Sequence, residues 1–277
     1  DKPSLTMGIV ELSVQDIKGM TDFYTNIVGF ELVSTGVGIS NLGDKNQIFL
    51  RLIEEKNYSI PVRGEAGLYH TAITHNNRKD VANRVARILE KTPERYQGSS
   101  DHSATEAFYF SDPEGNGLEL YYDRPRSEWK YKDGKPVMGS SYIDVNQYLK
   151  KYKDLPISEG ETKMGHVHLK IGNIAMGKEF YENILMFDNM STTDTALFVS
   201  RDGYNHNLGM NTWESLGATK KAPKTYGLRS FELIYHDINL YSQIRENLEK
   251  NSFPILQKNN GIQTEDPWGN IIIISKK

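Results

Sequence analysis

Short stretches of the chain alternate hydrophobic and polar positions, and stretches with helical spacing lie between them. Val10, Leu12 and Val14 occupy every second position, which predicts a half-buried strand. From 17 to 27 the apolar and aromatic residues keep helical spacing, and Gly29 is expected to end that helix. Glycine, asparagine and aspartate then separate three further predicted strands, at 31–34, 38–42 and 47–53. The pattern predicts a module of one strand, one helix and several strands.

The chain contains an internal duplication of this pattern. The segment GIVELSVQDIKGMTDFYTNIVGFE, from Gly8, aligns without gaps with GHVHLKIGNIAMGKEFYENILMFD, from Gly165. Likewise SDPEGNGLEL, from Ser111, recurs as EDPWGNIIII, from Glu265, and GLYHTAI recurs as GLRSFEL. Self-similarity of this kind is the mark of a repeated structural unit. Each half of the chain therefore repeats the other.

Each half also divides into two modules. We expect an N-terminal half at 1–122, with modules at about 7–55 and 67–122, and a C-terminal half with modules at about 164–213 and 226–275. The segment 123–163 is rich in charge and is expected to be a connector with one short helix around 145–152. The predicted fold class is α+β, with four βαβββ modules in two tandem halves, paired into cup-shaped mixed β-sheets with helices on the outside.

One acidic residue stands out in the segment SDPEGNGLELYY. The residues from Asp112 to Gly117 are turn formers, so a strand is expected to follow them. Alternation then places Leu118 and Leu120 on one face and Glu119 on the other. The simplest interpretation is that this second face is solvated, as in many antiparallel sheets.

The repeats allow the same position to be compared in all four modules. The second residue of the first strand is Ile9, His70, His166 or Ser230, and Ile273 matches Glu119 in the last strand. Modules two and three therefore supply two histidines and one glutamate on the inward face. Two imidazoles and one carboxylate are typical of non-haem Fe(II) sites, although zinc, nickel or manganese can occupy similar sets. The alternative is that these are ordinary polar residues in a wet cup.

Composition narrows the classes of partner. The chain has 277 residues, a formal net charge of −3 and no cysteine. The chain has no long basic tract of the kind that binds nucleic acid. Its apolar runs are all shorter than the roughly 20 residues that span a bilayer. The absence of cysteine excludes disulfides and thiolate ligands, and cytoplasm is the default expectation. The oligomeric state stays open, a homo-oligomer included.

The four-module pattern resembles the vicinal-oxygen-chelate superfamily of glyoxalases, bleomycin- and fosfomycin-resistance proteins and extradiol dioxygenases. Within it the chain is most similar to catechol 2,3-dioxygenases. The motifs that carry this resemblance are GHVHL from Gly165, SDPEGNGLEL from Ser111 and DGYNHNLG from Asp202. The resemblance implies a metal-dependent extradiol dioxygenase that cleaves a small catechol-type aromatic substrate with O2, in aromatic compound degradation. It makes Fe(II) the expected divalent metal, with Mn, Zn and Ni as alternatives.

The resemblance also implies roles for three residues outside the ligand set. His206 matches the acid–base histidine, Tyr109 matches a tyrosine beside the substrate oxygen, and His102 is a weaker candidate for a substrate-facing histidine. The alternatives without a catalytic role are that His206 is a hairpin histidine bonded to solvent and that Tyr109 is a half-buried strand residue. In the better-known extradiol enzymes the metal ligands come from the second half of the chain. Since Ser230 and Ile273 cannot serve, we expect module two to pair with three, and module one with four.

Several interpretations remain open at this stage. His168 is expected to lie behind the ligands or at the surface, and His75 and His236 are expected in loops. The first functional alternative is a glyoxalase-type isomerase or thiol transferase, which often draws a second carboxylate into the metal shell. The second is a protein that binds a small ligand, as in resistance, without turnover. The residues do not identify the catechol.

Overall fold

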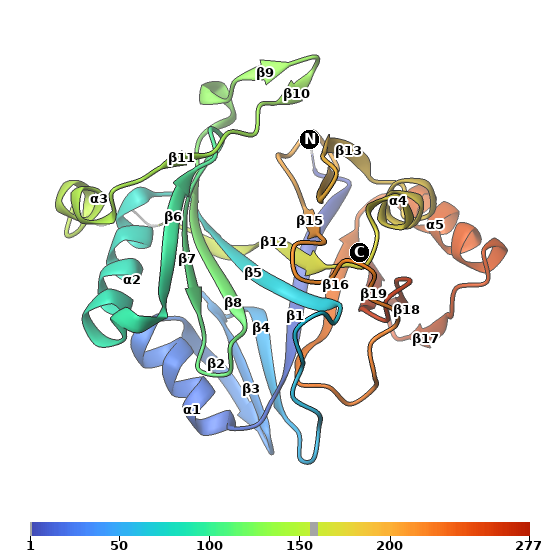
Figure 1. Cartoon of the computed structure of the whole chain (residues 1–277), viewed down its shortest axis with the longest axis horizontal. Helices are drawn as coiled ribbons and strands as arrows, with labels where there is room; N and C mark the ends of the chain where they lie inside the picture. The colour runs from blue at the N-terminus through green and yellow to red at the C-terminus, as the bar shows by residue number, and fades with distance from the viewer. Residues whose placement is uncertain (1, 156–159) are drawn as a thin grey trace. The chain divides into compact units, whose positions relative to one another are not determined.

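The computed structural model describes residues 2–155 and 160–277, which form an α+β protein of four βαβββ modules (Figure 1). Module one comprises β1 (Leu5–Val14), α1 (Ile17–Asp22), a π-helical turn (Phe23–Ile27), β2 (Glu31–Gly36), β3 (Ile39–Asp44) and β4 (Gln47–Glu54). Module two comprises β5 (Gly67–His75), α2 (Arg78–Lys91), a 3₁₀ turn (Pro93–Arg95), β6 (Tyr96–Asp101), β7 (Thr105–Ser111) and β8 (Gly117–Asp123). The predicted order of elements is confirmed.

The second half repeats this order. Module three comprises β12 (Thr162–Lys170), α4 (Ile174–Lys178), a π-helical turn (Glu179–Ile184), β13 (Asp188–Thr192), β14 (Ala196–Ser200) and β15 (Leu208–Asn211). Module four comprises β16 (Gly227–Tyr235), α5 (Ile238–Lys250), β17 (Leu256–Lys258), β18 (Gly261–Glu265) and β19 (Ile271–Lys276). The segment between the halves contains a 3₁₀ turn (Arg126–Glu128), β9 (Tyr131–Lys132), β10 (Lys135–Pro136), β11 (Ser141–Tyr142) and the expected helix α3 (Val145–Tyr152).

The helix of each module begins in the same way. Asp16, Asn77, Asn173 and Asp237 occupy the N-cap positions, and each side chain accepts a backbone N–H of the first turn. Such caps satisfy amide groups that have no partner within the helix. In module one the chain leaves the helix at Gly29, which has a φ of +89°. A glycine adopts this left-handed conformation without steric cost, so the predicted helix end is confirmed.

Two large mixed sheets contain the strands of the modules. One has the order β17-β18-β19-β16-β1-β4-β3-β2, and the other has the order β11-β6-β7-β8-β5-β12-β15-β14-β13. Strands of modules one and four therefore share one sheet, and strands of modules two and three share the other. The structure thus combines the modules as the residues at the repeat positions predicted.

The chain divides into two compact units. The first consists of Asp1–Ser13, Lys56–Tyr69 and His166–Lys277, and the second consists of Val14–Glu55 and His70–Gly165. In the first unit, β16 pairs antiparallel with β1 and parallel with β19, and β12 pairs parallel with β15. In the second, β5 pairs parallel with β8, and β6, β7 and β8 are antiparallel neighbours.

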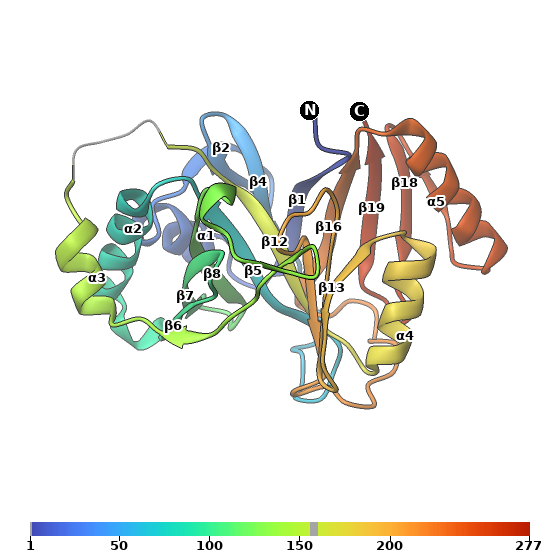
Figure 2. The ribbon, with the colours of Figure 1, turned by 90° about the horizontal axis from the view of Figure 1, so that it is seen from above.

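Helices cover the sheets within each unit. In the first unit α4 lies against β14 and β15, and α5 lies against β16; in the second, α2 and α3 lie side by side (Figure 2). The apolar face of α2 carries Val81, Val85 and Ile88, all fully buried. Each helix in the described part of the chain is too short or too polar to span a bilayer.

Candidate active site

The turn before β8 places Glu119. Asp112 is fully buried and accepts hydrogen bonds from the backbone N–H groups of Glu114 and Asn116, each at 2.9 Å. It also accepts the hydroxyl of Tyr24 at 2.7 Å. Burial raises the pKa of the Asp112 carboxyl, and these donors oppose that rise. A charged side chain thus organises the turn from which the strand carrying Glu119 starts.

Glu119 lies on a buried face of its strand. Leu118 and Leu120 are fully buried on the other face, and Glu119 is 3% exposed. The interpretation that Glu119 faces solvent is therefore wrong. A buried carboxylate is costly unless it meets a cation or hydrogen-bond donors, so Glu119 is expected to have such a partner.

The partner of Glu119 is His70. β5 and β8 pair in parallel with Ala72 beside Glu119, and the small alanine leaves room for the longer acid. His70 lies two residues before Ala72, on the same face of β5. Its Nε2 lies 2.8 Å from Glu119 Oε2, and His70 is 5% exposed. The strand pairing thus brings an imidazole and a carboxylate together in a buried environment.

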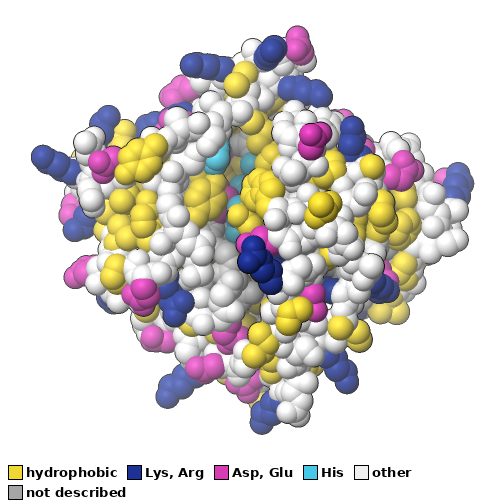
Figure 3. Space-filling view, viewed as in Figure 1, with side chains coloured by type: hydrophobic (Ala, Val, Ile, Leu, Met, Phe, Trp, Pro, Cys, Tyr) yellow, Lys and Arg dark blue, Asp and Glu magenta, His cyan; other side chains and the backbone are white. Residues whose placement is uncertain are grey.

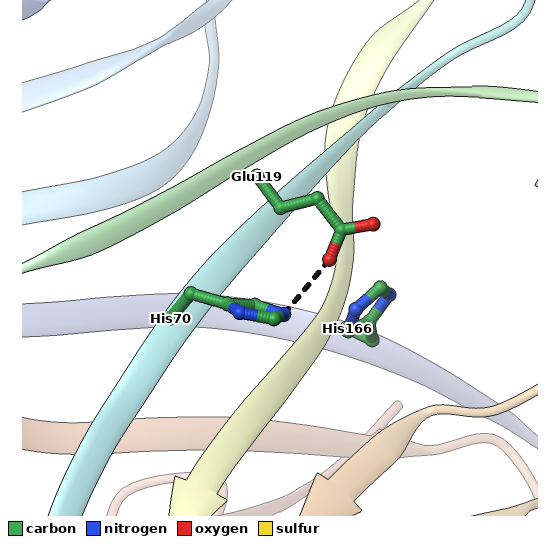
Figure 4. A group of neighbouring side chains, drawn as sticks. All are labelled: His70, Glu119 and His166. Atoms are coloured by element: carbon green, nitrogen blue, oxygen red, sulfur yellow. Dashed lines mark ion pairs between the residues drawn. The ribbon is translucent and has the colours of Figure 1, made fainter. Parts of the chain in front are cut away.

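His166 supplies a third donor. It follows Gly165 in β12 and is 2% exposed. A side chain at Gly165 would meet the Tyr121 hydroxyl, because an added Cβ would lie 1.8 Å from that oxygen. Ligand atoms of His70, Glu119 and His166 all lie within 4.8 Å of one another (Figure 4). Two neutral nitrogen donors and one anionic oxygen at this spacing suit a divalent metal ion.

Strand pairing identifies the residue that occupies the position of Glu119 in modules three and four. In module two Ala72 pairs with Glu119, in module four Glu232 pairs with Ile273, and in module three His168 pairs with Gly209. Ile273 and Gly209 therefore occupy the position of Glu119. Within residues 2–155 and 160–277, only the set with His70 has the composition and spacing of a metal site.

Tyr109 lies directly across from Glu119. The two residues pair in the antiparallel register of β7 and β8, so their side chains share a face. The Tyr109 hydroxyl lies 2.6 Å from His102 Nε2, and His102 Nδ1 lies 2.8 Å from the Gly139 carbonyl oxygen. A carbonyl only accepts, so Nδ1 carries the proton, and Nε2 of the neutral ring accepts the Tyr109 hydroxyl.

The turn that carries His102 is tightly held. It follows β6, which ends at Asp101. Arg124 donates to the Ser103 carbonyl at 2.6 Å and to Asp101 Oδ2 at 2.7 Å. Asp101 in turn accepts the Ser103 backbone N–H at 2.8 Å. Burial opposes ionisation of Asp101, but the Arg124 hydrogen bonds prevail and its pKa is lowered. This ion pair fixes the position of His102.

His206 lies next to a candidate ligand. Its ring centroid is 4.1 Å from that of His166 and 5.1 Å from that of Phe198. The neighbouring Asn207 is buried, and its side chain accepts the Arg201 backbone N–H at 2.9 Å. Asn207 therefore holds the turn, while His206 remains partly exposed beside His166.

One histidine differs from its predicted environment, and for another the structure selects one of two predicted environments. His75 is the last residue of β5 and fully buried, so the prediction of a loop position is wrong. His168 is 4% exposed and its Nε2 lies 2.9 Å from Asn211 Nδ2, which excludes the surface alternative. The third, His236, follows β16 and is partly exposed, as expected. The prediction for His75 failed because its burial depends on Arg84 of α2, a segment that packs over the end of the strand.

Comparisons with known proteins place this fold in a class. A model of the Glyoxalase/Bleomycin resistance protein/Dioxygenase superfamily matches residues 6–120. Catechol-2,3-dioxygenase from Bacillus subtilis (strain 168) is 30% identical over 271 residues, which cover 94% of this chain and 93% of that protein. Biphenyl-2,3-diol 1,2-dioxygenase 2 from Rhodococcus globerulus is 27% identical over 142 residues, 50% of this chain and 74% of that protein.

A solved structure agrees at the level of fold. A glyoxalase I variant from Zea mays matches with a TM-score of 0.62 at 14% identity, covering 99% of this chain and 94% of that chain. The fold is thus shared with a glyoxalase. The chain belongs to the glyoxalase, bleomycin resistance protein and dioxygenase superfamily.

Proposed function

We propose that this protein is a metal-dependent extradiol dioxygenase that cleaves a catechol-type substrate. The observation that carries the proposal is the buried set His70, Glu119 and His166, whose ligand atoms lie within 4.8 Å of one another. The 30% identity to a catechol-2,3-dioxygenase along nearly the whole chain supports it. Fold alone would not, because the superfamily also contains isomerases and binding proteins.

The donor set suits the proposed chemistry. His70, Glu119 and His166 would hold a divalent ion by two nitrogens and one oxygen, and the bound ion would supply binding for adjacent hydroxyl oxygens and for O2. We expect Fe(II), by analogy with the ring-cleaving relatives. In the overall reaction both atoms of O2 enter the product, and a ring C–C bond beside a hydroxylated carbon breaks to give a semialdehyde.

Tyr109 and His102 are placed to handle the substrate proton. The Tyr109 hydroxyl donates to His102, so its oxygen can accept the hydrogen of a substrate hydroxyl near Glu119. Proton removal from the substrate would then move the Tyr109 proton to His102 Nε2, while Nδ1 stays bonded to Gly139. We assign His206, beside His166, as the second acid–base group, because an imidazole can both accept and donate near neutral pH.

The test is oxygen uptake by metal-loaded protein. Protein purified without oxygen and loaded with Fe(II), Mn(II), Zn(II) or Ni(II) is mixed with substituted catechols, and O2 consumption and the absorbance of the ring-opened product are recorded. We expect uptake that is lost in Glu119→Gln. The matched control is Ser230→Ala at the position equivalent to His70, which should retain it.

Two other outcomes would reject the proposal. Iron-loaded protein that binds catechols without consuming O2 would be a ligand-binding protein. Isomerisation of a glutathione hemithioacetal would instead indicate a glyoxalase-type enzyme. The site argues against the second outcome, because Gly209 occupies the place of Glu119 in module three and provides no second carboxylate.

A further inference from the structure

The connector between the halves packs against the turn that carries His102, and both lie in the second unit of the chain. Gly139 of the connector lies on one side of this turn. Its carbonyl oxygen accepts a hydrogen bond from His102 Nδ1 at 2.8 Å, and its N–H donates to the His102 carbonyl at 3.3 Å. Two residues further on, β11 pairs with β6, with Ser141 beside Asp101. The connector therefore extends the sheet at the edge next to His102.

Arg124 holds the same turn from the other end of the connector. Its backbone N–H donates to the Ala104 carbonyl at 3.0 Å, and its Nη1 donates to the Ser103 carbonyl at 2.6 Å. Its two Nη groups also donate to the Asp101 carboxylate, at 2.9 and 2.7 Å. A guanidinium can make these bonds together because its donors form a rigid planar fork. Arg124 thus ties down the residues on both sides of His102.

The turn has a strained backbone. Ser103 has a φ of +71°, in the left-handed region, which is costly for a residue with a side chain. The connector also approaches the turn closely, because a Cβ added at Gly139 would lie 2.5 Å from Ser103 Oγ. Strain of this kind persists only where the surrounding structure enforces it, and it is concentrated at functional sites.

A hairpin of the connector lies between Arg124 and Gly139 in the chain. β9 and β10 are joined by a two-residue turn in which Asp133 and Gly134 have φ of +50° and +75°, as a tight hairpin requires. At its base Trp129 is 7% exposed and donates to the Arg124 carbonyl at 2.8 Å. The tip of the hairpin faces solvent, and Figure 3 shows Lys and Arg side chains over it, at the top of the view. The hairpin is therefore anchored at its base, next to Arg124.

We propose that the connector is a clamp that holds His102 in the tautomer needed for proton transfer, with Arg124 and Gly139 as positioning residues. Bonded to a carbonyl, Nδ1 must carry the proton, which leaves Nε2 unprotonated and able to accept the proton of Tyr109. A ring released from Gly139 exchanges between its two tautomers, and the tautomer with the proton on Nε2 takes none from Tyr109. The expected effect on turnover rests on the proposed function, whereas the effect on the tautomer does not.

Nitrogen-15 NMR of the histidine rings measures the tautomer, because the protonated and unprotonated nitrogens of a neutral imidazole have well-separated shifts. The sample is the full chain loaded with Zn(II), which is diamagnetic, at mildly alkaline pH, and His102→Gln identifies the His102 signals. We expect a protonated Nδ1 and an unprotonated Nε2 in the wild type. In Arg124→Met the two shifts should move toward each other as the tautomers mix.

Turnover of a catechol by the iron-loaded enzyme is the second measurement. In Arg124→Met we expect kcat to fall by about 10²-fold, because a misplacement of roughly 1 Å can cost that much, while KM changes little. Arg124→Lys keeps the positive charge, but one ammonium group cannot replace the planar fork, so its tautomer mixture and kcat should be intermediate. This variant also serves if Arg124→Met does not fold.

Arg78→Met is the matched control. Both arginines bind the buried carboxylate of Glu106, Arg78 at 2.9 and 2.8 Å and Arg124 at 3.0 Å. Of the two, only Arg124 donates hydrogen bonds to the turn of His102 in the described part of the chain. Arg78→Met therefore loses the same kind of ion pair, and it should keep the tautomer and the kcat of the wild type.

The outcomes separate the clamp from the proposed function. An unchanged Nδ1-protonated tautomer in Arg124→Met and Arg124→Lys overturns the clamp, even if the enzyme cleaves catechols. An equal change in Arg78→Met overturns it as well, since loss of the ion pair with Glu106 would then be the cause. A tautomer that depends on Arg124 alone, in a protein that never consumes O2, supports the clamp and rejects the dioxygenase.

Discussion

Lowering the pH from 7.5 to 5 should destabilise this protein through His75. The ring is fully buried, and its Nε2 accepts a hydrogen bond from Arg84 Nε at 3.0 Å. Its Nδ1 lies 3.1 Å from the Tyr121 carbonyl oxygen, so the proton of the neutral ring resides on Nδ1. Burial and the adjacent guanidinium lower the pKa of His75 from 6.5 to about 3. The bond to Tyr121 connects β5 to β8, the strands that carry His70 and Glu119, and the bond from Arg84 connects β5 to α2.

The direction and size of the effect follow from linkage. In the unfolded chain His75 takes up a proton below about pH 6.5, whereas the folded protein excludes it until about pH 3. The stability contributed by the neutral ring is therefore complete above pH 6.5 and is lost as the pH falls toward 3. These pKa values correspond to a loss of about 2 kcal/mol at pH 5 and about 5 kcal/mol for the full shift. A domain is stable by only about 5–15 kcal/mol, so the loss is measurable.

Urea unfolding between pH 7.5 and 5 measures this contribution, with a chelator present so that metal release does not affect the slope. His75→Gln keeps an acceptor for Arg84 and a donor for the Tyr121 carbonyl but cannot titrate. We expect the free energy of unfolding of the wild type to fall by about 2 kcal/mol more than that of His75→Gln over this range. His236→Gln is the matched control at a partly exposed ring. Burial and nearby lysines also lower the pKa of His236, so this variant should lose part of the pH dependence, but less of it than His75→Gln. Parallel pH dependences of wild type and His75→Gln would refute the reasoning.

Three further predictions concern the candidate active site. His70→Ala should lose most of its bound metal, measured by elemental analysis, whereas Ser230→Ala should not; full metal content in His70→Ala would show that the ligand set is wrong. His206→Ala should keep its metal and its catechol affinity while turnover drops by about 10²–10⁴-fold, as for other proton-transfer groups, and unchanged turnover would reject its role. Tyr109→Phe should lower turnover less and shift its pH profile, because His102 loses its hydroxyl partner; an unaltered profile would contradict the proton path through these two residues.

The sequence alone was sufficient to predict the modules and the residues that come together at the ligand set. Strand alternation has a period of two, so each inward position can be counted from a turn or a glycine. The internal repeats then allow one register to be checked against three others. For this reason the convergence of His70, Glu119 and His166 could be predicted although 96 residues separate the first from the last. The pairing of modules two and three followed from the same positions.

Only the tertiary structure decided the surroundings of that set. The contact between His102 and Tyr109 depends on the turn that Arg124 holds, and turn conformations are not encoded by a simple period. The burial of His75 depends on Arg84, which comes from a helix packed over the strand end. The contact between the rings of His168 and Phe198 follows from no spacing in the sequence, because Gly209 lies between them on a third strand. Alternation specifies which face a side chain takes, and packing between distant segments determines what it meets there.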